Sequence, residues 1–272
     1  MTGVIDLGSN SFIGVVVDGK RDVFEDMVVV GLGSRIRGDF IEGCEEARVF
    51  FESLLEKMRN FTEDIRAFGT HVFRNAVNGG DCFKEITRGV DGRILSPWEE
   101  GRYSYLSVVW DEEINVSSPV VLDLGGGSLE IVTKDAISSL PYGTWNVKRA
   151  LSGDPFEMAE KLSGEIDIPD GKIVGIGGTF VTIGAYKIGE WNLEKIHGEV
   201  ITKEDVENLM KLIKDMDETE IDSLDFVPKG RGKTLLPGTI VALAILKKKN
   251  EMIVSKRGYR YGIAWEIEMS KK

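Results

Sequence analysis

The 272-residue chain has few cysteines and histidines and no long hydrophobic run. Its two cysteines, Cys44 and Cys82, stand far apart with no second Cys or His at ligand spacing, so the sequence indicates neither a disulfide framework nor a zinc site. We expect both thiols to pack as small core residues. The longest uncharged run, residues 173–186, is shorter than the roughly 18 residues that cross a bilayer. Asp6 interrupts any signal-like stretch, so we expect a cytoplasmic protein with no membrane partner.

Basic residues are also scarce, because 34 Lys and Arg stand against 45 Asp and Glu, for a net charge of −11. A sequence-independent nucleic-acid binder needs a basic surface that displaces counterions, so this balance argues against a nucleic-acid partner. The charge is uneven, however. Residues 225–272 carry a local charge of +7, which leaves −18 on the first 224 residues. This basic stretch either faces an anion or forms a solvated surface.

Glycine is abundant, because 32 of the 272 residues are glycine, whereas glycine usually makes up about 7% of a chain. Apolar runs alternate with helical periodicity along the whole chain, which predicts an α/β fold. An antiparallel meander is expected over residues 4–5, 12–17 and 28–30. Helices are expected at 45–61, 97–109, 203–215 and 237–249, and strands at 120–124, 129–133, 172–176 and 252–255.

One short pattern occurs twice. The stretches from Asp6 to Ser11 and from Asp123 to Ser128 both place Asp, Leu, Gly and Ser in the same register between apolar runs. Each copy predicts a strand, a tight turn and a returning strand at the beginning of its own half. The predicted domains are residues 1–116 and 117–272, joined by the polar stretch 111–119, with a helix at 259–272 that can pack back on the first domain.

Turns built from Gly, Ser and Asn expose consecutive backbone N–H groups, which bind phosphate oxygens. Asp6 and Asp123 precede the two turns, where a divalent cation on the phosphate needs an oxygen ligand, because Mg²⁺ prefers one or two carboxylates with phosphate and water. The alternative is an ordinary Asp-stabilised hairpin turn. The candidate phosphate-binding residues of the two turns are Gly8, Ser9, Asn10, Ser11, Gly125, Gly126, Gly127 and Ser128.

A third glycine cluster, Gly177-Gly178-Thr179, follows a predicted strand and opens a predicted helix, whose free N–H groups can meet another phosphate. It is neither a G-x-G-x-x-G fingerprint nor a Walker A loop, so we expect no Rossmann or P-loop enzyme. A close strand-to-helix packing turn is the alternative.

In order and spacing, these motifs resemble the Ppx/GppA family of exopolyphosphatases and guanosine pentaphosphate phosphatases, within the superfamily of actin, sugar kinases and Hsp70. Residues 5–12 resemble the first phosphate motif of the family. Residues 123–130 resemble the second, including the acid that closes it, Glu130. Residues 94–102 resemble the segment of the catalytic glutamate, which falls on Glu100. The similarity extends over Thr70, Arg74, Ala76, Asn78, and residues 177–179, 230–231, 237–238 and 255–262.

The resemblance implies two ribonuclease-H-like, actin-like domains flanking an active-site cleft, in the short two-domain form of the family. It implies a hydrolase that releases terminal phosphate from inorganic polyphosphate or guanosine pentaphosphate. Glu100 would activate the attacking water. Asp123 and Glu130, with Asp6, would hold Mg²⁺ or Mn²⁺. Arg74 would pair with phosphate, with a plain surface ion pair as the alternative, while K⁺ and a homodimer are left open.

Arg231, Lys233 and Arg260 would form a basic wall along which a polyanion extends. The sequence departs from the family pattern at Pro97-Trp98, Gly101 and Gly232-Lys233, so the base falls on Glu99 if the register slips by one. Two other functions stay open, which are a phosphotransferase or kinase of the same superfamily and a sensor that binds phosphate ligands without turnover. We expect structural roles for His71, His197, Trp98, Trp110 and Trp145.

Overall fold

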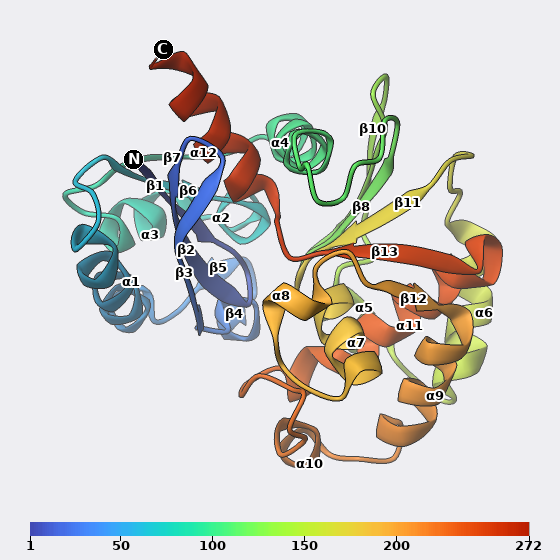
Figure 1. Cartoon of the computed structure of the whole chain (residues 1–272). Coiled ribbons are helices and arrows are strands. Elements are labelled where there is room, and N and C mark those ends of the chain that lie inside the picture. Colours follow the sequence, from blue (N-terminus) through green and yellow to red (C-terminus); the bar gives the residue numbers. More distant parts are fainter. Residues whose placement is uncertain (272) are drawn as a thin grey trace. The chain divides into compact units, whose positions relative to one another are not determined.

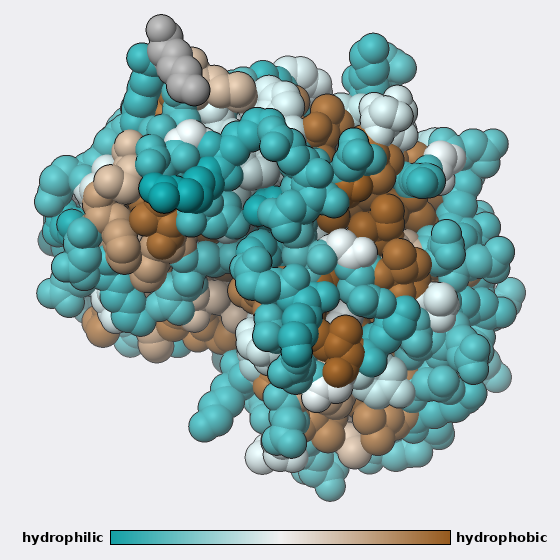
Figure 2. All heavy atoms as spheres, viewed as in Figure 1, coloured by the Kyte–Doolittle hydropathy of each residue, from teal (hydrophilic) through white to brown (hydrophobic). Residues whose placement is uncertain are grey.

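The computed structural model describes residues 1–271 (Figure 1). Two compact units divide the chain. Unit 1 consists of Met1–Ser107 and Tyr259–Lys272, and unit 2 consists of Val108–Gly258. Each unit contains its own β-sheet and helices, as the alternating apolar pattern predicts. Hydrophilic residues cover most of the face drawn in Figure 2.

A five-stranded sheet in the order β3-β2-β1-β6-β7 forms the centre of unit 1. The first three strands form the predicted antiparallel meander, and β6 and β7 continue the sheet in parallel with β1. The strands are β1 (Thr2–Leu7), β2 (Ser11–Asp18), β3 (Arg21–Val29), β6 (Ile65–Gly69) and β7 (Asp91–Ile94). The other elements are η1 (Leu32–Arg35), β4 (Ile36–Arg37), β5 (Phe40–Ile41), α1 (Cys44–Arg59), α2 (His71–Asn75), α3 (Gly79–Ile86), α4 (Pro97–Val109) and α12 (Tyr259–Ser270).

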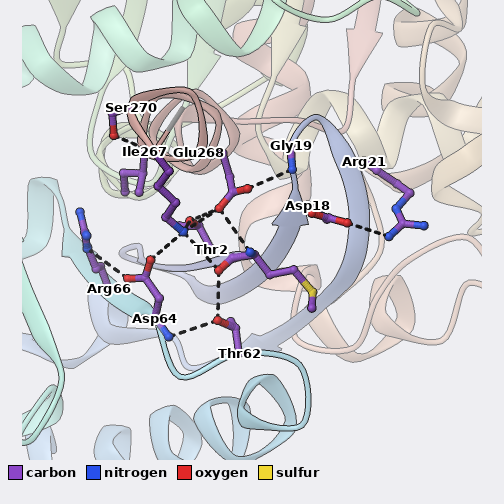
Figure 3. A network of polar contacts seen from close by, with 12 residues as sticks. Thr2, Asp18, Gly19, Arg21, Thr62, Asp64, Arg66, Ile267, Glu268 and Ser270 are labelled. Atoms are coloured by element: carbon purple, nitrogen blue, oxygen red, sulfur yellow. Dashed lines mark hydrogen bonds and ion pairs between the residues drawn. The ribbon is translucent and has the colours of Figure 1, made fainter.

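The C-terminal helix α12 packs against β1 and β2. Glu268 fastens it there, because its carboxylate accepts hydrogen bonds from Thr2 Oγ1 at 2.6 Å, Gly19 N at 3.1 Å and Lys271 Nζ at 2.7 Å (Figure 3). Burial opposes ionisation of this carboxyl group, but the three hydrogen bonds outweigh it and lower the pKa of Glu268 to about 2. The first strands of the chain and its last helix therefore form one polar network.

A disulfide joins Cys44, at the start of α1, to Cys82 in α3. This bond overturns the expectation that the two thiols pack unbonded. The fold brings their Cα atoms to 5.5 Å although 38 positions separate them, and sequence spacing carries no sign of such a long-range approach. In the chain-entropy description, closing a loop of this length stabilises the fold by about 4 kcal/mol.

Unit 2 is built on a six-stranded sheet in the order β10-β9-β8-β11-β13-β12. Within residues 1–271, no helix has the length and apolar character needed to cross a membrane. The strands are β8 (Val120–Leu124), β9 (Leu129–Val132), β10 (Ile137–Leu140), β11 (Ile173–Ile176), β12 (Val200–Thr202) and β13 (Glu251–Ser255). The helices are α5 (Thr144–Ala150), α6 (Pro155–Glu165), α7 (Gly178–Ile188), α8 (Leu193–Ile196), α9 (Lys203–Ile213), α10 (Glu218–Asp222) and α11 (Gly232–Lys249).

The strand order of unit 1 recurs in unit 2. In both sheets the first strand of a hairpin has an antiparallel neighbour on one side and a parallel neighbour on the other. In unit 1, β1 pairs with β2 and β6, and in unit 2, β8 pairs with β9 and β11. The two turns have the same register, since Leu7 faces Phe12 and Leu124 faces Leu129. The predicted repeat of strand, turn and returning strand is confirmed.

Candidate active site

Three segments of unit 1 meet because they follow three adjacent parallel strands. The turn Gly8–Ser11 follows β1, Thr70 and α2 follow β6, and α4 follows β7. Carboxyl ends of parallel strands lie at one edge of a sheet, which is where α/β proteins bind ligands. The backbone bond from Leu95 N to Gly69 O, at 2.9 Å, holds the last two connections together. The sheet thus gathers the first turn, Arg74 and Glu100 at one edge.

The first turn is held from one side. Gly8 N donates to Ser11 O at 3.0 Å, which closes the turn. The carbonyl oxygens of Ser9 and Asn10 accept hydrogen bonds of 2.7–2.9 Å from backbone N–H groups of residues 30–33. No hydrogen bond within residues 1–271 uses the N–H groups of Ser9 and Asn10. Fixed carbonyls and available N–H groups are the arrangement that binds an anion.

The second turn is built in the same way. Gly125 N donates to Ser128 O at 3.0 Å, and the carbonyls of residues 125–127 accept hydrogen bonds from residues 144–146 at the start of α5. Gly143 permits this contact, since a Cβ atom there would lie 2.1 Å from the carbonyl carbon of Gly127. In the described part of the chain, the N–H groups of Gly126 and Gly127 have no hydrogen-bond acceptor.

Two carboxylates of unit 2 lie on neighbouring strands. Asp123 on β8 is directly opposite Glu130 on β9, so the two side chains share one face of the sheet. Glu130 is buried and accepts a hydrogen bond from Ser139 Oγ at 2.8 Å. Two oxygen ligands on one face, completed by water and phosphate, match what Mg²⁺ prefers. This donor set fits the predicted metal.

The third predicted metal ligand, Asp6, belongs to unit 1 and is half-buried. Burial raises its pKa to about 6, although the charge of Arg260 and a hydrogen bond from Tyr259 oppose this rise. Both of these residues come from the start of α12. Nothing in the sequence spacing relates residue 6 to residue 259, so the sequence predictions missed Tyr259 as a partner of Asp6.

The neighbouring acids Glu99 and Glu100 have different surroundings. Glu99 accepts hydrogen bonds from Ser96 N at 2.9 Å and Ser96 Oγ at 2.8 Å, while Glu99 N donates back to Ser96 Oγ. This reciprocal pair caps α4. Burial raises the pKa of Glu99, but the hydrogen bonds from Ser96 and the charge of Arg93 lower it by more. The pKa of Glu99 is therefore below its usual value. Glu100 instead is buried and accepts a hydrogen bond of 2.8 Å from Arg74.

The third glycine cluster lies beside the second turn, since Ile176 at the end of β11 pairs with Asp123. The guanidinium of Arg231 lies against Gly178 at the start of α7, where an added Cβ would be 1.6 Å from Nη2. Arg231 and Thr179 are both buried, and burial lowers the pKa of Arg231 to about 10. The structure thus brings Gly177, Gly178, Thr179 and Arg231 together.

The three residues of the expected basic wall have different surroundings within their own units. Arg260 is buried in unit 1 and donates to Glu25 at 2.6 Å, whereas Arg231 is buried in unit 2 and only Lys233 is exposed. Trp98 also differs from the expected packing role, because 60% of it is exposed. Trp145 is buried, as expected.

His197 belongs to a cluster that the sequence spacing did not reveal, in which the side chains of His197 and Asp111 are buried and Glu113 is exposed. Its Nε2 lies 3.1 Å from Asp111 Oδ2, and Arg257 Nη1 donates to Asp111 Oδ1 at 2.6 Å. Arg257 Nη2 also donates to Glu113 at 2.7 Å. These acids and the imidazole are close enough to hold a metal ion, but the guanidinium already supplies the positive charge. We interpret the cluster as structural.

Comparisons with known proteins agree with the fold and the motifs. A family model described as the Ppx/GppA phosphatase family matches residues 41–271. The crystal structure of an Aquifex aeolicus member of the Ppx/GppA protein family is 26% identical, with a TM-score of 0.78 over 100% of this chain and 98% of that one. No curated protein matches.

Two further solved structures are less than 25% identical and bear on the fold alone. An exopolyphosphatase from Cytophaga hutchinsonii is 19% identical, with a TM-score of 0.85 over 99% of this chain and 98% of that chain. An exopolyphosphatase-like protein is 21% identical, with a TM-score of 0.83 over 100% of this chain and 99% of that one. The predicted α/β fold of two actin-like domains and the predicted family resemblance are confirmed.

Proposed function

The chain belongs to the Ppx/GppA phosphatase family, and on this premise we propose that it releases the terminal phosphate of inorganic polyphosphate or guanosine pentaphosphate by attack of water. One observation above all supports this proposal. In both turns, at residues 8–11 and 125–128, the central carbonyl oxygens accept hydrogen bonds, and within residues 1–271 the central N–H groups remain available. Such turns bind phosphate oxygens and need no contact with a nucleobase or a sugar. A phosphoanhydride is the substrate class that suits them.

The proposed roles follow from the surroundings of each side chain. Phosphoryl transfer depends mainly on positioning and on charge stabilisation, so the turns bind the phosphate and Arg74 pairs with it. Glu100 accepts the proton of the attacking water. Glu99 is unsuited to this role because it caps α4. Arg231 adds positive charge beside Gly178.

Asp123 and Glu130 are the proposed ligands of Mg²⁺ or Mn²⁺, and Asp6 is a further candidate ligand in unit 1. When bound, such an ion neutralises charge that develops on the phosphoryl oxygens. The pairing of Asp123 with Glu130 across β8 and β9 supports this assignment.

The decisive experiment measures phosphate released from each of the two substrates without any acceptor molecule. Glu100→Gln keeps the shape of the side chain but removes the base, so we expect turnover to fall by about 10²-fold or more, with folding unchanged. Glu99→Gln is the matched control and should retain most of the activity. A large loss in Glu99→Gln alone would move the base by one residue. Absence of release by the wild type would favour the phosphotransferase or the sensor.

A further inference from the structure

We infer that Arg74 is also the residue that positions Glu100, an inference that rests on the proposed function. A single nitrogen, Nη1 of Arg74, donates to Leu95 O and to Glu100 Oε2, both at 2.8 Å. Only 15% of the Arg74 side chain and 10% of the Glu100 side chain are exposed. The rigid guanidinium of Arg74 therefore links the Glu100 carboxylate to the backbone carbonyl of Leu95.

The elements that carry these three groups explain why an arginine is needed. Arg74 lies in α2, which follows β6, and Glu100 lies in α4, which follows β7. Leu95 connects β7 to α4, and its N–H is bonded to Gly69 at the end of β6. The guanidinium therefore ties the base to the ends of both strands. A lysine ammonium lacks the planar, fixed set of donors that spans these acceptors.

The other donors of the guanidinium remain for the substrate. Neither Nη2 nor Nε of Arg74 takes part in a hydrogen bond within residues 1–271. A phosphate oxygen bound by these donors would share one planar group with the Glu100 carboxylate. The same arginine then fixes both the phosphate and the group that deprotonates the attacking water, and so sets the distance between them. Displacements of about 1 Å in such geometry cost up to about 10²-fold in rate.

A double-mutant cycle tests this inference, because it separates the effect of Arg74 on Glu100 from its effect on phosphate. Arg74→Lys is made in the wild type and in Glu100→Gln, and kcat and KM are measured for both. We expect kcat to fall by about 10-fold or more in the presence of Glu100 and by less than about 2-fold in Glu100→Gln. The increase in KM, which reports phosphate binding, should be similar in both backgrounds.

Arg93→Lys is the matched control, because Arg93 forms an ion pair of 2.6 Å with the neighbouring Glu99. It should change kcat little in either background. Should Arg74→Lys fail to fold, as judged by thermal unfolding, Arg74→Ala with added guanidinium replaces it. Guanidinium should restore part of kcat only where Glu100 is present.

Equal losses of kcat in the two backgrounds, from an active wild type, would overturn the positioning role alone. Arg74 would then act only on phosphate. A wild type that releases no phosphate from either substrate would overturn the proposed function and this inference together.

Discussion

Glu99 and Glu100 illustrate how much one position along a helix matters. Successive helical residues point about 100° apart, so two adjacent acids in the first turn of α4 cannot face the same groups. Glu99 turns back to Ser96 and closes the helix end, and Glu100 turns to the buried guanidinium of Arg74. Both acids also interact favourably with the helix dipole, so this effect does not distinguish them.

The acids on β8 and β9 lead to a prediction about metal dependence. Asp123→Asn or Glu130→Gln should raise the Mg²⁺ concentration that gives half of the maximal activity by about 10-fold or more, because each change removes an anionic oxygen ligand. Excess EDTA should abolish activity in the wild type, and Mg²⁺ or Mn²⁺ should restore it. Phosphate release is measured against metal concentration for each variant.

The control for this prediction is Asp135→Asn, which neutralises an exposed acid in the turn that follows β9. Its metal requirement should equal that of the wild type. Activity that persists unchanged in excess EDTA would contradict the metal role of Asp123 and Glu130. Both residues would then serve only the hairpin that contains them.

At the level of elements, α12 leads to a prediction about stability. Glu268→Gln should lower the free energy of unfolding at pH 7 by about 1–3 kcal/mol, because it replaces the charged acceptor of three hydrogen bonds with a neutral one (Figure 3). The pKa of Glu268 is lowered in the fold to about 2. Its contribution is therefore complete above its usual pKa of 4.5 and disappears as the pH falls towards 2.

Urea unfolding at pH 7 and at pH 3 measures this effect. The difference between the wild type and Glu268→Gln should be clearly smaller at pH 3. Glu251→Gln, at an exposed acid in β13, should change stability little at either pH. A difference of equal size at both pH values would mean that the charge of Glu268 contributes nothing.

Element boundaries were predictable where local chemistry fixes them. The helix Pro97–Val109 and the strand Val120–Leu124 have the predicted limits, since proline suits a first helical turn and β-branched residues favour a strand. The predicted start of a helix at Pro237 is wrong, because α11 begins at Gly232 and contains this proline. Tertiary packing buries nearly all of that helix and outweighs the local preference.

The parts of the candidate site that local sequence determines were predictable, and the contacts between distant residues were not. Each phosphate-type turn is a local pattern of six residues, so its register could be read directly from the sequence. The contacts of Arg74 with Glu100, of Asp6 with Tyr259 and of Cys44 with Cys82 join distant positions. Family resemblance supplied the importance of Arg74 and Glu100, but no spacing rule predicts which distant side chains meet.

At the level of the whole molecule, hydrogen bonds join the beginning of the unit 2 segment to its end. The chain enters at Val108 and leaves after Gly258, and Arg257 donates to Asp111 and Glu113 within that unit. Burial alone would raise the pKa of Asp111, but His197 and Arg257 lower it to about 2. The carboxylate therefore stays ionised through the neutral range and keeps both ends of the segment together.

The return of α12 to unit 1 has a consequence for biosynthesis. Unit 2 is one uninterrupted segment, whereas unit 1 needs residues at both ends of the chain. A ribosome that has released residues 108–258 has supplied everything that unit 2 requires, while β1 and β2 still lack α12. We expect unit 2 to fold first, although domains nearer the N-terminus usually do so.

Nascent chains stalled before and after residue 259 leaves the ribosomal tunnel would test this order. Brief protease treatment of the earlier chains should cleave within residues 1–107 and spare residues 108–258. Protection of residues 1–107 should appear only when α12 has emerged. Early protection of residues 1–107 would contradict this order. Until α12 has emerged, translation therefore leaves the segment with Arg74 and Glu100 exposed to proteases and chaperones.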